Sequence, residues 1–316
     1  MKPFPQNLLA VGLTLLVTSI ASAADASVAR QLEAAGLNVV LDASGTATEV
    51  SYKDPRISYG EAEYRLIGSF KGLRVLRLGI CKSLTDETLP LLANLTNLEE
   101  FSGDSIMLSD DGYRHFTAFP RLQKLSLSHP RGTFTGAGWK HLQALPALRS
   151  FSSGGTTTHN DEGIAAIGGF PALRELRFGH AGASAAGVNA ALARLPKLTT
   201  LGLTQNQAKD EGGVWRPSLT GATLPIIAKM TDLESLSLSE AELGYDTLRA
   251  LKVLPKLKKL ELRCIFISPE DLPKLKGDLP GVVVTYQEPT VLERKNLTKL
   301  LGLKPLEIEA SAAPKP

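Results

Sequence analysis

The sequence is poor in the groups that crosslink or catalyse. Of its 316 residues only two are cysteines, Cys81 and Cys264, and only 6% are aromatic. Two cysteines are too few for the disulfide-rich scaffolds of small secreted domains. The sequence also contains no Gly-x-Ser-x-Gly elbow, no His-Glu-x-x-His motif and no phosphate-binding loop. Because these motifs mark common hydrolases, zinc proteases and nucleotide-binding enzymes, we expect no enzyme activity, no cofactor and no metal site.

An excess of charge of one sign is also lacking. The 35 basic and 32 acidic residues give a formal net charge of +3. Lysines gather in residues 252–276, but Glu261, Glu270 and Asp271 are interleaved with them. Interleaved charges favour a solvated surface over a basic stripe that binds the phosphate backbone of a nucleic acid. We therefore expect no nucleic-acid partner.

One apolar run stands at the N-terminus. Residues 8–20 (LLAVGLTLLVTSI) follow Lys2 and precede the small residues Ala21-Ser22-Ala23. A membrane span needs about 20 apolar residues, and this run is shorter. We interpret residues 1–23 as a cleaved signal peptide, an interpretation that we favour over a retained anchor. The predicted product is exported to the periplasm or the extracellular space, with no stable membrane insertion after cleavage.

A leucine motif, Leu-x-x-Leu-x-Leu, recurs along most of the chain. The steps between its first leucines are 25, 24, 26, 25, 25, 35 and 24 residues. A nearly fixed period of this length indicates a solenoid built from strand-plus-helix units. The anchor leucines are Leu73, Leu98, Leu122, Leu148, Leu173, Leu198, Leu233 and Leu257.

The repeat of residues 73–98 shows how one unit is expected to fold. Leu76 and Leu78 alternate with Arg77, which places two leucines on one face of a short strand and Arg77 on the other. Thr85 then stands as an N-cap before a helical segment with leucines at helical spacing. Equivalent caps recur at Ser109, Thr135, Asn160, Ser184, Thr220 and Ser268.

In its leucine motif, period and capping pattern the chain resembles the leucine-rich repeat family, in the form found in ribonuclease-inhibitor-like and cysteine-containing repeats. More narrowly, it resembles a secreted bacterial leucine-rich repeat protein. In that family the ninth position of the repeat is Asn or Cys, as Cys81 and Asn206 are here. The resemblance implies an α/β solenoid, a leucine-rich repeat horseshoe with a parallel concave β-sheet and convex helices. It also implies protein binding rather than chemistry.

The predicted organisation has four parts. Residues 1–23 are the signal peptide and residues 24–45 an N-terminal cap, with a helix over 27–35 and a strand over 37–41. Residues 46–286 form the repeat domain, about nine to ten repeats with an insertion at 204–218. Residues 287–316 provide a C-terminal capping helix, with Leu292 and Leu297 on its apolar face, and a disordered tail.

Stacking also fixes distances between repeats. Cys81 and Cys264 lie in repeats seven steps apart, which places them roughly 34 Å apart at the spacing of neighbouring strands. A disulfide between them is excluded, because it needs Cα atoms within about 7 Å. His129 and His180 occupy equivalent positions two repeats apart. A separation of roughly 10 Å is too long for them to share one metal ion.

The candidate binding surface is the concave sheet face, supplemented by the insertion. Outward strand positions are small and hydroxylated in the middle and charged towards both ends. In the insertion, Trp215 beside Arg216 is a pair of residue types enriched at interface hot spots. The alternatives are an inert, solvated sheet face and a Trp215 that folds back on its own loop. The candidate residues are Arg77, Glu100, Lys124, Ser126, Ser152, Glu175, Arg177, Thr200, Trp215, Arg216, Ser235, Ser237, Lys259 and Glu261.

From these patterns we predict an exported, monomeric, non-enzymatic scaffold that binds another protein. The competing hypothesis is a glycan or cell-wall adhesion module that uses the Ser/Thr/Gly-rich concave face to hold an extended peptide-like or glycan chain. A weaker third hypothesis, an enzyme with its site in residues 204–218, lacks paired acid, base and nucleophile residues.

Overall fold

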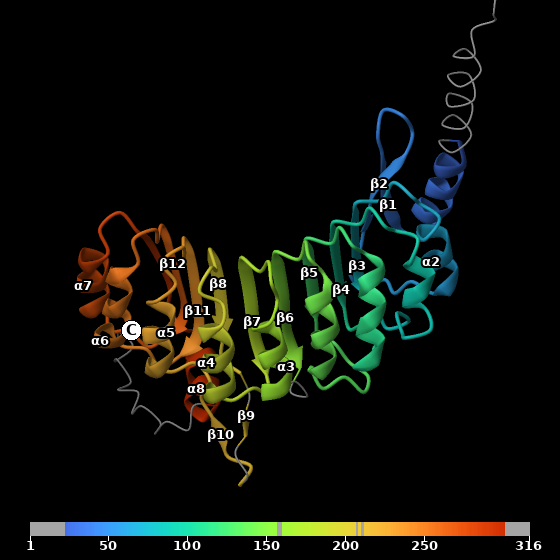
Figure 1. Ribbon diagram of the computed structural model, residues 1–316. Coiled ribbons are helices and arrows are strands. Elements are labelled where there is room, and N and C mark those ends of the chain that lie inside the picture. The colour runs from blue at the N-terminus through green and yellow to red at the C-terminus, as the bar shows by residue number, and fades with distance from the viewer. Residues whose placement is uncertain (1–22, 157–159, 207, 210–211, 301–316) are drawn as a thin grey trace, which may run out of the picture.

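The computed structural model describes residues 23–156, 160–206, 208–209 and 212–300. The predicted signal peptide (apart from residue 23), the predicted tail at 304–316 and His159 lie outside these residues. Within them, an open sheet of 11 strands has the order β1-β2-β3-β4-β5-β6-β7-β8-β11-β12-β13 (Figure 1). The chain therefore forms the α/β solenoid, a leucine-rich repeat horseshoe, that its period predicts.

The strands of this sheet are β1 (Leu37–Leu41), β2 (Ala47–Tyr52), β3 (Val75–Ile80), β4 (Glu100–Asp104), β5 (Lys124–Ser128), β6 (Ser150–Thr156), β7 (Glu175–Ala181), β8 (Thr200–Thr204), β11 (Ser235–Ala241), β12 (Lys259–Ile265) and β13 (Val283–Gln287). From β2 onwards every neighbouring pair is parallel. Only β1 is antiparallel, to β2.

The helical segments between residues 61 and 278 lie side by side on one face of the sheet (Figure 1). The α-helices are α2 (Glu61–Ile67), α3 (Asp161–Ile167), α4 (Ala185–Ala193), α5 (Leu224–Ile227), α6 (Tyr245–Leu248), α7 (Asp271–Asp278) and α8 (Val291–Leu300). The 3₁₀ helices are η1 (Leu89–Leu92), η2 (Asp111–Ala118), η3 (Ala137–Ala144), η4 (Gly221–Thr223) and η5 (Arg249–Val253). A 3₁₀ helix rises about 2.0 Å per residue rather than about 1.5 Å, so a short segment reaches further towards the next strand.

Equivalent residues of successive repeats stand opposite one another in the sheet. Leu76 lies opposite Phe101, which in turn lies opposite Leu125. Because side chains alternate between the two faces of a strand, this register stacks one inward residue per repeat into a continuous ridge. The ridge consists of Leu76, Phe101, Leu125, Phe151, Leu176, Leu201, Leu236 and Leu260, none more than 1% exposed. The predicted inward leucines are confirmed.

Aromatic rings fill the core in the middle of the solenoid. The Trp139 ring lies 5.2 Å from the Phe151 ring and 6.0 Å from the Phe178 ring, in edge-to-face arrangements. Ser153, a buried serine, lies opposite Leu127 and Phe178 of the neighbouring strands. A large ring next to a small side chain keeps the packing density constant along the solenoid.

Several predicted caps bind the first turn that follows them. The side chains of Ser109, Asn160, Ser184 and Ser268 accept the backbone N–H group three residues ahead, at 3.1–3.2 Å. At Thr85 the prediction differs, because a turn intervenes and η1 begins only at Leu89.

Aspartates join the caps of adjacent repeats. Asp86 accepts both the backbone N–H and the hydroxyl of Ser109, and Asp161 does the same for Ser184. The third residue after each of these caps is glycine, and a Cβ at Gly187 would collide with the Asp161 carboxylate. The glycine therefore leaves room for a carboxylate that links two repeats.

Two different structures close the ends of the solenoid. At the N-terminal end, residues 23–34 are helical, and Asp25 accepts the backbone N–H of Ala47 at 2.9 Å. At the C-terminal end, Leu297 of α8 packs against Cys264. Leu292, expected on the apolar face of this helix, is 67% exposed. That expectation is wrong, because only one side of α8 touches the end of β12.

The insertion adds a short hairpin without disturbing the sheet. β9 (Ala208–Lys209) pairs antiparallel with β10 (Trp215–Arg216), and the hairpin projects beyond the carboxyl ends of the strands (Figure 1). Its base is a buried polar network in which the Gln205 side chain accepts the backbone N–H groups of Ser218 and Leu219 at 2.7 and 2.8 Å. Asn206 accepts the backbone N–H of Ala181 at 3.0 Å.

The two cysteines are free and buried. Cys81 follows β3 and Cys264 lies in β12, and six strands of the sheet separate those two. None of the helices in the described residues is long and apolar enough to cross a membrane.

Candidate functional site

The register of the sheet gathers twelve of the fourteen predicted binding residues into two straight rows on the concave face. The first row runs through Glu49, Val75, Glu100, Lys124, Ser150, Glu175, Thr200, Ser235 and Lys259. The second runs through Ser51, Arg77, Ser102, Ser126, Ser152, Arg177, Gly202, Ser237 and Glu261. The predicted Trp215 and Arg216 lie on β10 instead, away from these rows.

At the N-terminal end of the face the charges neutralise one another. Arg77 forms ion pairs with Glu49 at 2.6 Å and with Glu100 at 2.8 Å. Lys124 approaches Glu100 at 3.4 Å. The hydrogen bond from Arg77 holds the pKa of Glu100 below its usual value, and the same bond raises the pKa of Arg77. Arg77 and Glu100 are therefore engaged within the fold, which sequence reasoning did not anticipate.

In the middle of the concave face the backbone is not covered by projecting side chains at several positions, because those positions are glycines. A Cβ at Gly154 would lie 2.6 Å from the carbonyl oxygen of Gly179, and a Cβ at Gly179 would lie 2.5 Å from the Thr204 Cβ. Neither contact is sterically allowed, so adjacent strands approach closely here. Arg177 extends across the neighbouring strand, with its Cγ 3.2 Å from the Cβ that Gly202 lacks. The result is a flat floor of hydroxyls and backbone.

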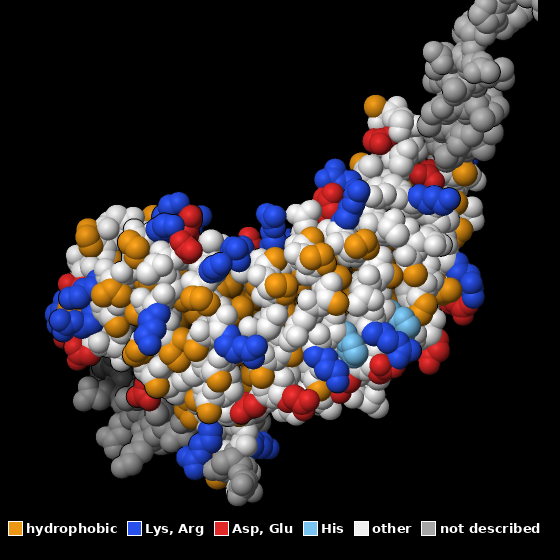
Figure 2. Space-filling view, viewed as in Figure 1, with side chains coloured by type: hydrophobic (Ala, Val, Ile, Leu, Met, Phe, Trp, Pro, Cys, Tyr) orange, Lys and Arg blue, Asp and Glu red, His pale blue; other side chains and the backbone are white. Residues whose placement is uncertain are grey.

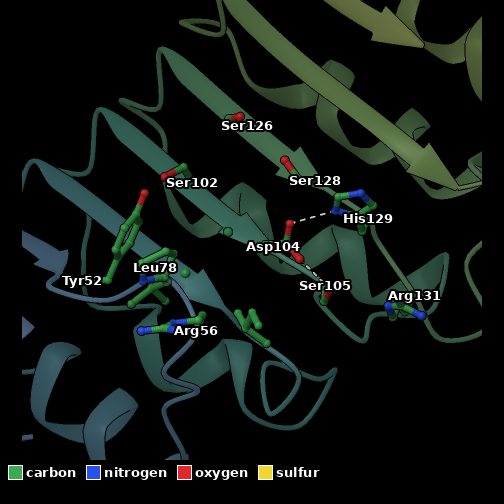
Figure 3. Close-up of a pocket in the computed structure, with 14 residues that line it drawn as sticks. Tyr52, Arg56, Leu78, Ser102, Asp104, Ser105, Ser126, Ser128, His129 and Arg131 are labelled. Atoms are coloured by element: carbon green, nitrogen blue, oxygen red, sulfur yellow. Dashed lines mark hydrogen bonds and ion pairs between the residues drawn. The ribbon is translucent and has the colours of Figure 1, made fainter. Parts of the chain in front are cut away.

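A hollow of about 600 Å³ lies where β3, β4 and β5 end (Figure 3). Tyr52 and Arg56 border it on one side, and His129 and Arg131 on the other. Hydroxyls line its floor, from Ser102, Ser126 and Ser128. Near its centre the His129 Nδ1 lies 2.8 Å from Asp104 Oδ2.

A second hollow of about 320 Å³ adjoins the first and shares Ser128 and His129 with it. It extends over β6, β7 and β8 to Ser237 and includes Arg177 and His180 in its lining. The two hollows together form a groove along the carboxyl half of the concave face. We call this the concave groove.

His180 forms a pair that spans two repeats. Its Nε2 lies 2.8 Å from Oε2 of Glu240, sixty residues further along the chain. The hydrogen bond to Glu240 raises the pKa of His180, against the opposing effect of partial burial. Two histidine–carboxylate pairs thus lie along the groove.

Both histidines owe their position to an unusual backbone conformation. His129 and His180 have φ angles of 45° and 54°, and the equivalent Ser105, Glu240 and Cys264 are also left-handed. This conformation is costly for residues other than glycine, yet it recurs at the eighth position of the repeat, counted from the anchor leucine. The equivalence of His129 and His180 is visible in the sequence, but their carboxylate partners were missed. Periodicity offers a signal, because Asp104 stands 25 residues before His129 and Glu240 stands at the same repeat position as His180.

The arrangement offers hydrogen-bonding groups rather than an assembled nucleophile. Within the described ranges, no hydroxyl donates to or accepts from the imidazole of His129 or His180. A serine nucleophile needs such a contact with its base. The groove instead presents serine hydroxyls, which both donate and accept, along a floor of nearly constant height.

Comparisons with known proteins add little beyond this geometry. No family model matches the sequence, and no curated protein matches it. Among solved structures the chain is similar to an internalin, InlF, from Listeria monocytogenes, with 18% identity and a TM-score of 0.49 over 72% of this chain and 57% of that one. It is also similar to internalin C2 of the same organism, with 17% identity and a TM-score of 0.42 over 64% of this chain and 76% of that one. The chain thus spans little more than half of InlF, and the repeat fold rests on the register and core described above.

Proposed function

We propose that the protein is a non-enzymatic scaffold that binds an extended segment of another protein in the concave groove. The observation that carries this proposal is the flat, hydroxyl-lined floor between β5 and β11, where glycines and serines replace larger side chains. Six strand spacings separate β3 from β11, a distance of about 29 Å. An extended peptide of about nine residues has this length.

The residues proposed to contact the partner are the concave ones. Ser126, Ser152, Ser235 and Ser237 supply hydroxyls, and Thr200 adds another. Glu175, Arg177, Lys259 and Glu261 supply charges that take part in no ion pair among the described residues. Ser150 donates a hydrogen bond to Glu175 at 3.1 Å. Arg77, Glu100 and Lys124 form one rim of the face through their own ion pairs. Trp215 and Arg216 would contact only a partner that extends to the hairpin.

Peptide selection with matched variants tests this function. Peptides selected from a displayed random library would be synthesised, and their Kd measured by fluorescence anisotropy on the wild type, on Ser152→Arg and on Ala144→Arg. Ser152 lies in the concave groove, whereas Ala144 is exposed at the end of η3 on the convex side. We expect Ser152→Arg to weaken binding at least about tenfold, because an arginine fills the floor, and Ala144→Arg to leave it unchanged.

Two outcomes would reject the proposal. Peptides that bind both variants as well as the wild type do not use the groove. A library that yields no peptide, together with glycan-array ligands that are lost in Ser152→Arg, would identify the groove as a glycan site.

We also propose that the chain is exported and that residues 1–23 are removed, on the basis of the apolar run and the small residues before Ala24. N-terminal sequencing of the protein from a periplasmic or extracellular fraction should begin at Ala24. A chain that keeps Met1 and sediments with membranes would show a retained anchor instead.

A further inference from the structure

The amino edge of the sheet, where the strands begin, carries a second charge pattern. Towards both ends of this edge, residues of adjacent repeats pair with opposite charge. Arg74 forms an ion pair with Glu99 at 2.8 Å. Lys258 pairs with Glu234 at 2.7 Å, and Lys256 pairs with Asp232 at 2.6 Å. Each pair joins neighbouring strands, so the edge neutralises itself at its ends.

The middle of the same edge does not follow this pattern. Arg149 and Arg174 occupy the position equivalent to Arg74, and the backbone N–H of Arg174 donates to the carbonyl of Arg149 at 2.8 Å. Two like charges therefore lie on adjacent strands, and Arg194 and Lys197, near the end of the repeat that contains Arg174, add two more. Ion pairs among the described residues include none of these four cations. Lys and Arg side chains are visible along the upper rim of the molecule in Figure 2.

A hollow of about 540 Å³ lies beside these cations. Arg174, Arg194 and Lys197 line it, and no acidic side chain does. Gly168 and Gly169 also line it, at a turn where the preceding repeat carries Gln143 and Ala144. Its apolar lining comes from Phe170, Leu173 and Leu195, with Pro171 and Pro196.

One carboxylate, Asp232, lies near enough to these cations to be affected by them. The pKa of Asp232 is lowered mainly by its hydrogen bond with Lys256, and more weakly by Arg174 and Lys197. Asp232 is therefore already engaged by Lys256. Arg174 donates through one guanidinium nitrogen to the carbonyl of Leu173 at 2.9 Å, which fixes its direction and leaves its other N–H groups for an acceptor.

We propose that this hollow binds the carboxylates of an acidic polypeptide segment that also carries apolar side chains. Carboxylates match the planar donor fork of arginine, and two adjacent arginines that form no ion pair among the described residues favour an anionic ligand. The apolar lining accepts a leucine-like side chain between the carboxylates, which a chain of phosphates lacks. The site lies on the strand-starting edge, so it is separate from the concave groove and does not depend on the function proposed for that groove.

The test uses a fluorescein-labelled decapeptide of glutamates interspersed with two leucines, and the same peptide with glutamine in place of glutamate. Their Kd would be measured by anisotropy on the full-length protein and on the variants Arg174→Ala, Lys197→Ala and Lys258→Ala. Lys258 lies on the same edge but is neutralised by Glu234. It is therefore a matched control for net charge. We expect Arg174→Ala to weaken binding about tenfold, the cost of losing hydrogen bonds to a charged group, with a smaller loss for Lys197→Ala and less than a twofold change for Lys258→Ala.

Three results would overturn the proposal. Equal losses in Lys258→Ala and Arg174→Ala would show general attraction by net charge. Equal binding of the glutamine peptide would show that the carboxylates are not recognised. Inorganic phosphate that binds with the same dependence on Arg174, while the acidic peptide does not bind, would identify a free oxyanion as the ligand. Circular dichroism of each variant confirms that a lost interaction is not lost folding.

Discussion

The flanks of the solenoid and its middle use the same residue positions differently. In the flank, Arg77 lies between Glu49 and Glu100. In the middle, Arg177 holds the same row position but extends over Gly202, and no carboxylate of the described residues forms an ion pair with it. The amino edge repeats this contrast. The N-terminal flank of the concave face and both ends of the amino edge use charge to join neighbouring strands, whereas the charges in the middle form no ion pair among the described residues.

The contrast continues in the core, and this gives the largest expected effect. Trp139 and Leu89 occupy equivalent positions four residues after their caps, and both are buried. Trp139→Ala should lower the free energy of unfolding by about 3–5 kcal/mol, because it removes a large ring that packs against Phe151 and Phe178 and leaves a cavity. Leu89→Ala, in the leucine-rich flank, should cost about 2–3 kcal/mol. Urea unfolding followed by circular dichroism measures both, and a smaller loss for Trp139→Ala would show that the middle core repacks.

The charged rows give an intermediate effect. Arg77→Met leaves Glu49 and Glu100 close together without their cation, and should lower the free energy of unfolding by about 1 kcal/mol, a value limited by the partial exposure of all three side chains. Arg177→Met should change it by less than about 0.5 kcal/mol. Equal losses in urea unfolding would mean that both arginines stabilise the fold equally, which contradicts the division between flank and middle.

The smallest effect concerns pH at the boundary between the two regions. The pKa of His180 is raised in the folded state by Glu240, so the stabilisation is fully present below the unfolded value of about 6.5 and is lost as the pH rises through the folded pKa. At pH 5.5 the free energy of unfolding of the wild type should therefore exceed that of Glu240→Gln. The difference should be about 0.5 kcal/mol or less, because His180 is partly exposed. At pH 9 the two free energies of unfolding should be equal. Glu242→Gln, at an exposed neighbouring position, serves as the control. A difference that grows with pH would contradict the assignment.

The period of the sequence predicts most of the scaffold. Because a parallel stack places residues about 25 positions apart side by side, the inward leucines, the concave rows and several caps follow from counting. The period alone does not predict the helix type, since the choice between an α-helix and a 3₁₀ helix depends on how tightly each helical segment packs. It also does not give the antiparallel β1, which lies outside the period.

The candidate site was predictable as a surface but not as a set of interactions. The rows of hydroxyls follow from alternation along each strand, whereas the ion pairs of Arg77 depend on side-chain reach between repeats. The same holds for Asp86 and Ser109, and for His180 and Glu240. Comparing charges at offsets of one or two repeats is the step that finds such pairs in a repeat sequence.

The buried base of the β9–β10 hairpin has a consequence for how this scaffold can vary. Gln205 and Ser218 close the excursion with hydrogen bonds of their own, and β8 still meets β11 in the register of an uninterrupted repeat. The register of β8 and β11 therefore does not depend on the length of the insertion between them. The tip of the hairpin can therefore be lengthened or replaced, in evolution or by design, without changing the strand register. Any effect on stability is expected to be confined to the hydrogen-bonded base at Gln205 and Ser218.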